Sequence, residues 1–550
     1  MRKGDVLTVD IIDFGANGEG VAKVDGIPVF IPMAIKGEMV EVKIVHAKKD
    51  FAFGEIVKII KPSENRVKPK CIHFGKCGGC DLQHVDYQAQ KQIKLNAVSN
   101  TLRKIAGIQT EISGIFCGEP YYYRNKLALP FGVKGDRVVV GFYEKQSHQI
   151  VPLKDCPLHG EWLRPLIKEV TEWATVNKIS VYNEKSGKGL LRHLVARKLD
   201  TLSVTIVVNG NSIPQCKELY ERLKSVFKTV AIYVSINKEN TNVILGDNVK
   251  LVNGEEVKQS LGGFMAKISP LSFLQVNTAV MQTLYDEVAK RLDGEKSLLE
   301  LYSGVGLLTA QILTRLKELK ITAVEIEKSA VADAKKLMAD LGLSDRAEEI
   351  CADASEFIDK AKTEKGVLTG FDSVILDPPR KGCDGEVLNA INESGVEKIV
   401  YVSCNPATLA RDLKLLTNYQ IVDINLFDLF AQTSHVETLV VLSKKIPDSH
   451  INIDVEFGEG EGQFSLKKIK ERAEARKPKE KVTYKMIQEY IEKTYGFKVH
   501  MAYIAEVKRD LGLPMYDAPN AVEELKRPRA HPTPKMAKAI KETLKHFEII

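Results

Sequence analysis

Hydrophobic and polar positions alternate over short runs throughout residues 1–60. Runs such as VLTVDIIDFG and GEGVAKVDGIPVFIP are rich in β-branched residues and are separated by glycine-containing turns. Short strands at this spacing are typical of a small all-β barrel. The basic, proline-containing residues 61–70 indicate a linker. We therefore expect residues 1–60 to form a barrel of their own.

The pattern changes twice in the next part of the chain. Small and apolar residues recur at helical spacing over residues 84–106, which predicts one long amphipathic helix. Strand-like runs such as DRVVVGFYE and TLSVTIVVNG then dominate up to residue 262. We expect a central α+β domain over residues 61–262, whose helix near 84–106 is free to pack on the domain that follows.

From residue 263 to 447, short apolar strands alternate with helical segments. The strand candidates include SLLELYSGVG, ITAVEIE, FDSVILDPP, KIVYVSCNP and TLVVLSKK. Such alternation predicts an α/β fold with a doubly wound, Rossmann-like sheet. Residues 448–550 begin with charged, glycine-containing stretches and continue with three helical patterns, which indicates a linker and a helical extension. The chain as a whole is thus predicted to be a multidomain α/β protein.

Composition adds limits to this outline. The 550 residues contain no apolar run long enough for a membrane span, and MRKGDVLTVD lacks the apolar core of a signal peptide. Nine cysteines are too few for a disulfide scaffold, so metal ligands, catalytic groups or core fillers are expected. We expect a cytoplasmic monomer with no membrane partner.

The net charge of +7 is concentrated near the C-terminus. Residues 465–550 hold 20 Lys and Arg against 12 Asp and Glu, an excess of +8, so the rest of the chain sums to −1. Either a solvated tail or an attraction to a polyanion explains this excess. The helical, basic extension could serve as an accessory RNA-binding module.

One strand–helix turn carries the signs of a cofactor site. Gly304 and Gly306 follow an apolar strand, and Glu325 ends the next strand where a ribose contact is expected. Asp353 follows a third strand candidate, within reach of an adenine. Because the third glycine of a pyrophosphate cradle is missing, S-adenosylmethionine fits better than NAD. A plain turn beside a surface acid is the alternative.

The fourth and fifth strands end in reactive groups. Asp377 begins DPPRKGCD, whose Arg380 indicates an anionic partner, and Cys404 ends the following strand. Carboxyl ends of parallel strands meet at one edge, so these groups are expected there together. Glu437 precedes the last strand, with His435 as a second candidate base. A buried cysteine often only packs, but a thiol, a base and a methyl donor together indicate chemistry.

Methylation of uracil at C5 requires a thiol, a base and a methyl donor. C5 is too weak a nucleophile to take a methyl group directly, whereas addition of a thiolate at C6 activates it. Cys404 is the candidate nucleophile, and Glu437 the candidate base that removes the C5 proton.

Five motifs resemble those of S-adenosylmethionine-dependent RNA uracil-5-methyltransferases, in the order of that family. They are SFLQVN, ELYSGVG, LDPPRKGCD, VSCNPATLARD and QTSHVET. The resemblance spans about residues 1–445 and implies that residues 1–60 form a TRAM, or OB-like, RNA-binding barrel. It implies catalytic roles for Cys404 and Glu437. The cofactor contacts that it implies are Gln275, Tyr302, Glu325 and Asp377, and the RNA contacts are Phe273, Arg124 and Arg192.

CIHFGKCGGC supplies Cys71, Cys77 and Cys80, and Cys156 is the best candidate for a fourth ligand. Four thiolates suit zinc or an iron–sulfur cluster, and spacing alone leaves both open. The resemblance implies a 4Fe-4S cluster, which marks the 23S ribosomal RNA branch of the family. Transfer RNA is the alternative substrate. A cytosine-5 methyltransferase and a non-catalytic RNA-binding factor are more distant alternatives.

Overall fold

The computed structural model describes residues 1–15, 17–145, 147–365, 368, 370–445, 484–511 and 531–547. Within it the chain divides into two compact units, residues 1–448 and 449–550. The linker expected after residue 448, and most of the basic segment KRPRAHPTPK, lie outside the described residues.

The N-terminal strands form one six-stranded sheet in the order β1-β5-β6-β4-β3-β2. Alternating valine, isoleucine and alanine side chains from these strands fill a core of their own, and the TRAM-type barrel predicted for this region is confirmed. The strands are β1 (Val6–Asp10), β2 (Asp13–Phe14), β3 (Gly20–Val24), β4 (Ile27–Ile31), β5 (Met39–Ala47) and β6 (Ala52–Lys61).

The central segment contains a seven-stranded sheet in the order β10-β9-β8-β11-β12-β13-β14. Two helices, α2 (Leu163–Val176) and α3 (Cys216–Lys224), bury their apolar side chains against it around Trp173. Its strands are β8 (Lys126–Lys134), β9 (Arg137–Tyr143), β10 (Ile150–Pro152), β11 (Leu191–Lys198), β12 (Leu202–Val208), β13 (Val230–Ile236) and β14 (Asn248–Asn253). A separate hairpin follows, formed by β15 (Lys258–Leu261) and β16 (Phe264–Lys267).

The third sheet has eight strands in the order β19-β18-β17-β20-β21-β23-β22-β7, which confirms the predicted doubly wound sheet. Its first five members are parallel, and β23 lies antiparallel between β21 and β22. The strands are β17 (Ser297–Leu301), β18 (Lys320–Glu325), β19 (Ala347–Cys351), β20 (Ser373–Leu376), β21 (Lys398–Ser403), β22 (Tyr419–Phe427) and β23 (Glu437–Lys444).

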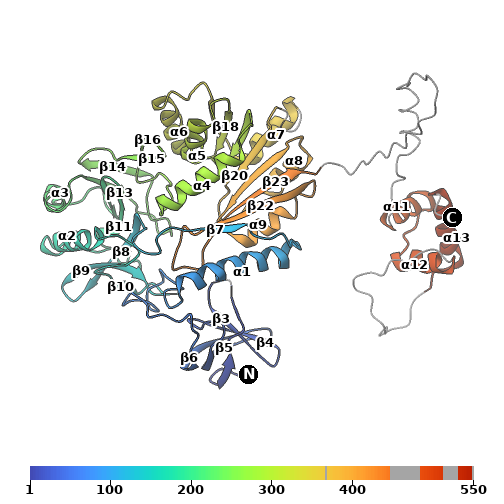
Figure 1. Cartoon of the computed structure of the whole chain (residues 1–550), viewed down its shortest axis with the longest axis horizontal. Coiled ribbons are helices and arrows are strands. Elements are labelled where there is room, and N and C mark those ends of the chain that lie inside the picture. The colour runs from blue at the N-terminus through green and yellow to red at the C-terminus, as the bar shows by residue number, and fades with distance from the viewer. Residues whose placement is uncertain are drawn as a thin grey trace, which may run out of the picture. The chain divides into compact units, whose positions relative to one another are not determined.

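Helices cover both faces of this sheet (Figure 1). One face is packed by α4 (Thr278–Arg291), α5 (Leu307–Arg315) and α6 (Lys328–Asp340). The other is packed by α7 (Ala354–Lys365), α8 (Gly385–Glu393) and α9 (Pro406–Leu413), together with α1 (Tyr87–Ala106). Because the strands are covered on both sides, they read as continuous apolar runs in the sequence.

Residues 87–116 belong structurally to this catalytic layer rather than to the central sheet. Helix α1 packs against α9 and lies between the barrel and the catalytic sheet (Figure 1). Strand β7 (Gly114–Phe116) pairs in parallel with β22 at the sheet edge, which the sequence pattern did not predict. A buried ion pair of 2.6 Å joins Lys94 of α1 to Asp428, just past β22.

The described residues of the C-terminal unit form α11 (Tyr484–Tyr495), α12 (Met501–Asp510) and α13 (Pro534–His546). Isoleucine, valine and leucine side chains from all three meet in a small core. Thr533 caps α13 by accepting a hydrogen bond from the Met536 amide, and Pro534 occupies the first turn.

Candidate active site

The carboxyl ends of the parallel strands set one edge of the catalytic sheet. The register pairs Leu301 with both Val324 and Leu376. The residues that follow these positions therefore share that edge: Tyr302, Glu325 and Asp377. The structure thus brings together three of the predicted cofactor-site residues.

Cys404 and Glu437 meet through the antiparallel pairing of β21 with β23. Ser403 lies opposite Thr438 in this ladder. The next step of the register aligns Cys404 with Glu437, on the same edge as Asp377. Glu437 is only 2% exposed, whereas Cys404 is partly buried. A partly accessible thiol thus lies beside a carboxyl group shielded from water.

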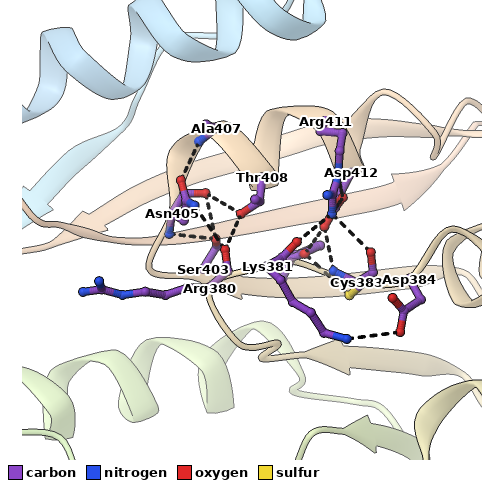
Figure 2. Close-up of polar contacts among 11 residues, drawn as sticks. Arg380, Lys381, Cys383, Asp384, Ser403, Asn405, Ala407, Thr408, Arg411 and Asp412 are labelled. Carbon is purple, nitrogen blue, oxygen red and sulfur yellow. Dashed lines mark hydrogen bonds and ion pairs between the residues drawn. The ribbon is translucent and has the colours of Figure 1, made fainter. Parts of the chain in front are cut away.

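The turn after Cys404 is fixed by hydrogen bonds that Figure 2 draws. The side chain of Asn405 accepts from the Ala407 amide at 3.1 Å and so caps α9. Its Nδ2 also donates to the carbonyl oxygen of Arg380 at 3.1 Å, as does Thr408 Oγ1 at 3.3 Å. The cap therefore ties the cysteine turn to the loop that carries Arg380.

Asp412 fastens the other end of that loop to α9 (Figure 2). Its buried carboxylate accepts a hydrogen bond from the Cys383 amide at 2.9 Å and one from the Tyr401 hydroxyl at 2.6 Å. Arg411 donates to the carbonyl oxygen of Lys381 at 2.9 Å. Gly382 has a φ of 79°, and an added Cβ would lie 2.5 Å from both Arg411 and Asp412. Only glycine fits this turn.

The acids on this edge carry raised pKa values. Burial raises the pKa of Asp377 to about 7. Burial, with a contribution from Asp377, raises the pKa of Glu437 well above its usual range. Burial and the neighbouring Glu437 raise the pKa of the Cys404 thiol, and Arg380 opposes that rise. Acids with raised pKa values beside a thiol in a ligand crevice are typical of catalytic sites.

The strand–helix turn at residues 302–306 fits an adenosyl cofactor. Gly304 has a φ of 59°, and no atom lies within 4 Å of the place where its Cβ would stand. Its amide donates to Glu325 Oε2 at 3.0 Å, so the loop and the predicted ribose-binding acid are held together. Tyr302 adopts a φ of 66°, which is strained for a bulky residue. Asp353 lies at the start of α7, where its carboxylate accepts from the Ser355 amide at 2.8 Å.

The loop that contains Phe273 and Gln275 is held by the central domain. Arg197, at the end of β11 and 5% exposed, donates to the carbonyl oxygen of Ser272 at 3.1 Å. The buried Asn125 donates to the carbonyl oxygen of Gln275 at 3.0 Å. Phe273 itself is 68% exposed, as a residue that contacts a base requires. Sequence reasoning missed Arg197 and Asn125.

The two arginines predicted to contact RNA from the central domain have different surroundings. Arg192 is 7% exposed, and its guanidinium donates to the carbonyl oxygens of Asn237 at 2.8 Å and Glu239 at 2.7 Å. These bonds hold the guanidinium against the backbone that follows β13, and the RNA contact of Arg192 stays a prediction. Arg124 is partly buried and lies beside the predicted metal ligands.

Cys71, Cys77, Cys80 and Cys156 line one pocket of about 70 Å³. The Gly79 amide donates to Cys77 Sγ at 3.4 Å, and Gln83 Nε2 donates to Cys80 Sγ at 3.1 Å. In the described part of the chain, no three ligand-type side chains converge as a single metal ion requires. All four predicted ligands therefore line one pocket, and the sulfurs of Cys77 and Cys80 each accept a hydrogen bond from an amide.

Two family patterns match the chain. Residues 86–445 match the family described as tRNA (Uracil-5-)-methyltransferase, and residues 2–57 match the TRAM domain. The chain belongs to this family of RNA uracil-5-methyltransferases. In this methyltransferase the family match ends at residue 445, before the C-terminal unit.

Relatives and a solved structure agree with this assignment. The methyltransferase is 38% identical over 454 residues to an uncharacterized RNA methyltransferase of Caldanaerobacter subterraneus subsp. tengcongensis, covering 81% of this chain and 99% of the relative. It is 36% identical over 453 residues to one of Clostridium tetani, covering 80% of this chain and 97% of the relative. The Pyrococcus abyssi tRNA (uracil-54, C5)-methyltransferase, solved with S-adenosyl-L-homocysteine, has 28% identity and a TM-score of 0.65, covering 79% of this chain and 99% of that one.

These matches show that the protein is an S-adenosylmethionine-dependent RNA methyltransferase of the uracil-5 family. None of the helices in the described residues has the length and apolarity that crossing a membrane requires.

Two further buried groups lie near the edge and escaped sequence reasoning. Burial raises the pKa of Tyr285 on α4, and the negative charges of Asp377, Glu300 and Glu437 raise it further. Glu300 on β17 is 1% exposed and accepts a hydrogen bond from Thr309 Oγ1 at 2.7 Å. Burial raises its pKa to about 8, so it holds a proton at neutral pH.

The raised pKa of Glu300 predicts that the free energy of unfolding decreases as pH rises. The unfolded chain releases this proton near the ordinary glutamate pKa of 4.5, and the folded chain near 8. The contribution of Glu300 to the free energy of unfolding is therefore fully present below about pH 4.5. It falls between pH 4.5 and about pH 8, by up to about 5 kcal/mol for a pKa shift of this size. Glu300→Gln should remove this part of the decline in the free energy of unfolding, measured by urea denaturation from pH 5 to 8.

Glu348→Gln, an exposed change on β19, should leave the decline unchanged. Parallel pH curves for the unaltered protein and Glu300→Gln would contradict the assignment of a buried proton to Glu300.

Proposed function

We propose that this enzyme transfers a methyl group from S-adenosylmethionine to C5 of a uridine in 23S ribosomal RNA, through a covalent bond between Cys404 and C6. The observation that carries the mechanism is the pairing of Ser403 with Thr438, whose next step places Cys404 beside Glu437. This pairing supplies a nucleophile and a base on the edge that also carries the cofactor loop.

Each group has a defined task in this sequence. The thiolate of Cys404 adds to C6, and the electron pair released toward C5 makes that carbon nucleophilic. The bound cofactor supplies an electrophilic methyl group at this point. Glu437, in its ionised form, then removes the C5 proton. Burial raises the pKa of this carboxyl group, so its carboxylate is a stronger base than that of an exposed glutamate. The electron pair of that C–H bond restores the C5–C6 double bond and expels the thiolate.

The remaining edge residues position the reactants. Gly304, Tyr302 and Glu325 form the turn that would hold the adenosyl group. Gln275 and Asp377 would hold its amino-acid part, and Asp353 its adenine. Phe273 is exposed for stacking on a base, and the exposed Arg380 is available to a phosphate.

Two observations bear on the class of RNA that the enzyme methylates. The pocket lined by four cysteines favours 23S ribosomal RNA, because the resemblance joins such a cluster to that branch. The similarity to the Pyrococcus abyssi enzyme, which acts on uracil 54 of tRNA, favours transfer RNA as the second candidate. A non-catalytic RNA-binding role is disfavoured, since a chain without activity has no need of Cys404 beside Glu437.

We assign a 4Fe-4S cluster to Cys71, Cys77, Cys80 and Cys156. All four thiols line one pocket, and amide groups donate hydrogen bonds to two of their sulfurs, as protein groups do around iron–sulfur clusters. The resemblance to the 23S ribosomal RNA branch favours the cluster over zinc. Asp81 and Leu82, directly after Cys80, both donate their amides to the carbonyl oxygen of Gln432 at 3.0 Å. The cysteine segment therefore braces the loop that leads to Glu437.

Anaerobically purified protein should contain about four irons per chain and absorb broadly near 400 nm, as expected of thiolate-bound iron–sulfur clusters. Cys80→Ser should lose most of the iron, whereas Cys216→Ser, outside the pocket, should keep it. Stoichiometric zinc without iron in the unaltered protein would contradict the cluster.

Cys404→Ala and Glu437→Gln should fail at different steps. The first should lower methylation of a 23S transcript by at least about 10⁴-fold and form no covalent complex, because the adduct cannot begin. The second should add and transfer the methyl group but retain the C5 proton, so a denaturation-resistant enzyme–RNA species should accumulate. Denaturing gels and tritium incorporation from labelled S-adenosylmethionine measure both.

Cys351→Ala and Glu348→Gln, both exposed on β19, are matched controls that should retain activity. Methylation by Cys404→Ala, or a Glu437→Gln enzyme that forms no adduct, would contradict the assigned roles. Mapping of 5-methyluridine in RNA from a deletion strain separates the substrates, since the missing mark lies in 23S ribosomal RNA or in transfer RNA.

A further inference from the structure

A cavity of about 310 Å³ opens between the barrel and α1, outside the catalytic edge. This size lies at the lower end of the range for small-molecule sites, about 300–1,000 Å³. Its walls come from three segments. The polar and aromatic lining residues are Asp13, Phe14 and Lys36 of the barrel, Asn65 of the linker, and Gln92, Asn96 and Asn100 of α1.

The α1 wall presents a column of amides. Gln92, Asn96 and Asn100 are spaced four residues apart, so they lie on one face of the helix. Gln92 Nε2 donates to Asn96 Oδ1 at 3.0 Å. This bond leaves Gln92 Oε1 available as an acceptor and Asn96 Nδ2 available as a donor. Paired amide donors and acceptors match the hydrogen-bonding edge of a nucleobase.

The barrel wall supplies the other parts of a nucleotide site. Phe14 is partly exposed and packs on the apolar floor formed with Ile35, Val85 and Ile93. An aromatic ring of this kind offers a surface on which a base can stack. Lys36 is exposed and forms no ion pair with the described residues, so its ammonium group is available to a phosphate.

This cavity shares structural supports with the catalytic edge. Gln90 of α1 donates to Gln432 Oε1 at 3.0 Å, in the loop that leads to Glu437. The barrel touches the same loop, since a Cβ added to Gly18 would lie 3.5 Å from Ser434 Cβ. The barrel and α1 therefore both contact the loop that leads to Glu437.

We propose that this cavity binds one unpaired nucleobase of the substrate RNA, with Gln92 and Asn96 on its edge and Phe14 on its face. The proposal rests on the proposed function, because it requires a single-stranded RNA segment around the target uridine. Proteins that recognise single-stranded RNA bind splayed bases through amides and aromatic rings. The cavity would thus select the sequence beside the target, while the catalytic edge selects the uridine.

Fluorescence anisotropy with labelled single-stranded A12, C12, G12 and U12 tests this proposal. Gln92→Ala combined with Asn96→Ala should weaken binding of at least one of these RNAs about 10-fold, the order expected for a lost bidentate base contact. Phe14→Leu, which keeps an apolar side chain but loses the ring, should weaken binding by a similar factor. Gln88→Ala, exposed on α1 outside the cavity, should bind within about twofold of the unaltered enzyme.

Methylation kinetics on a 23S transcript should show a KM raised about 10-fold and an unchanged kcat for both cavity variants. Unchanged affinity for all four RNAs, in variants with unaltered melting temperature, would overturn the proposal. Loss of affinity that Gln88→Ala shares would overturn it as well. Failure of the proposed function would differ from failure of the cavity proposal. In the first case the unaltered enzyme would methylate no RNA, whatever the RNA affinity of the cavity variants.

Discussion

The antiparallel register between β21 and β23 is the constraint on which the site depends. Ser403 lies opposite Thr438, so Cys404 and Glu437 meet at the end of the ladder. Side chains alternate between the two faces of a strand, and a shift of one residue would exchange the faces of every side chain on β23. Both strands are buried on both sides, so the close packing of differently shaped side chains fixes this register.

Gln432 connects that register to the rest of the molecule. It adopts a φ of 70° and is 1% exposed, five residues before Glu437. Its carbonyl oxygen accepts hydrogen bonds from the amides of Asp81 and Leu82. Its side-chain oxygen accepts a hydrogen bond from Gln90 Nε2, and its backbone amide donates one to Gln90 Oε1. The cysteine segment and α1 therefore meet at one residue of the loop that delivers the base. A pocket of thiols that transfers no electrons in this chemistry can still influence the site through this connection.

Much of the site could be predicted because parallel strands deliver their last residues to one edge. This rule and the motifs predict from the sequence alone that Asp377, Glu325 and Cys404 lie together. They could not find Arg197 or Asn125, because their roles depend on how the central domain meets the loop at residues 272–276. The surroundings of Arg192 could not be predicted for a related reason. Sequence pattern marks an arginine in a strand as unusual, but only tertiary packing shows its partners, here the carbonyl oxygens of Asn237 and Glu239.

The covalent bond to Cys404 is the central claim, and its most direct test uses an RNA that the enzyme methylates, synthesised with 5-fluorouridine. Fluorine at C5 cannot be removed as a proton, so the bond between Sγ and C6 persists after methyl transfer. Digestion and mass spectrometry should find the nucleotide on the peptide that contains Cys404, with an added methyl group. A stable adduct on another cysteine, or methylated RNA without any adduct, would contradict the account.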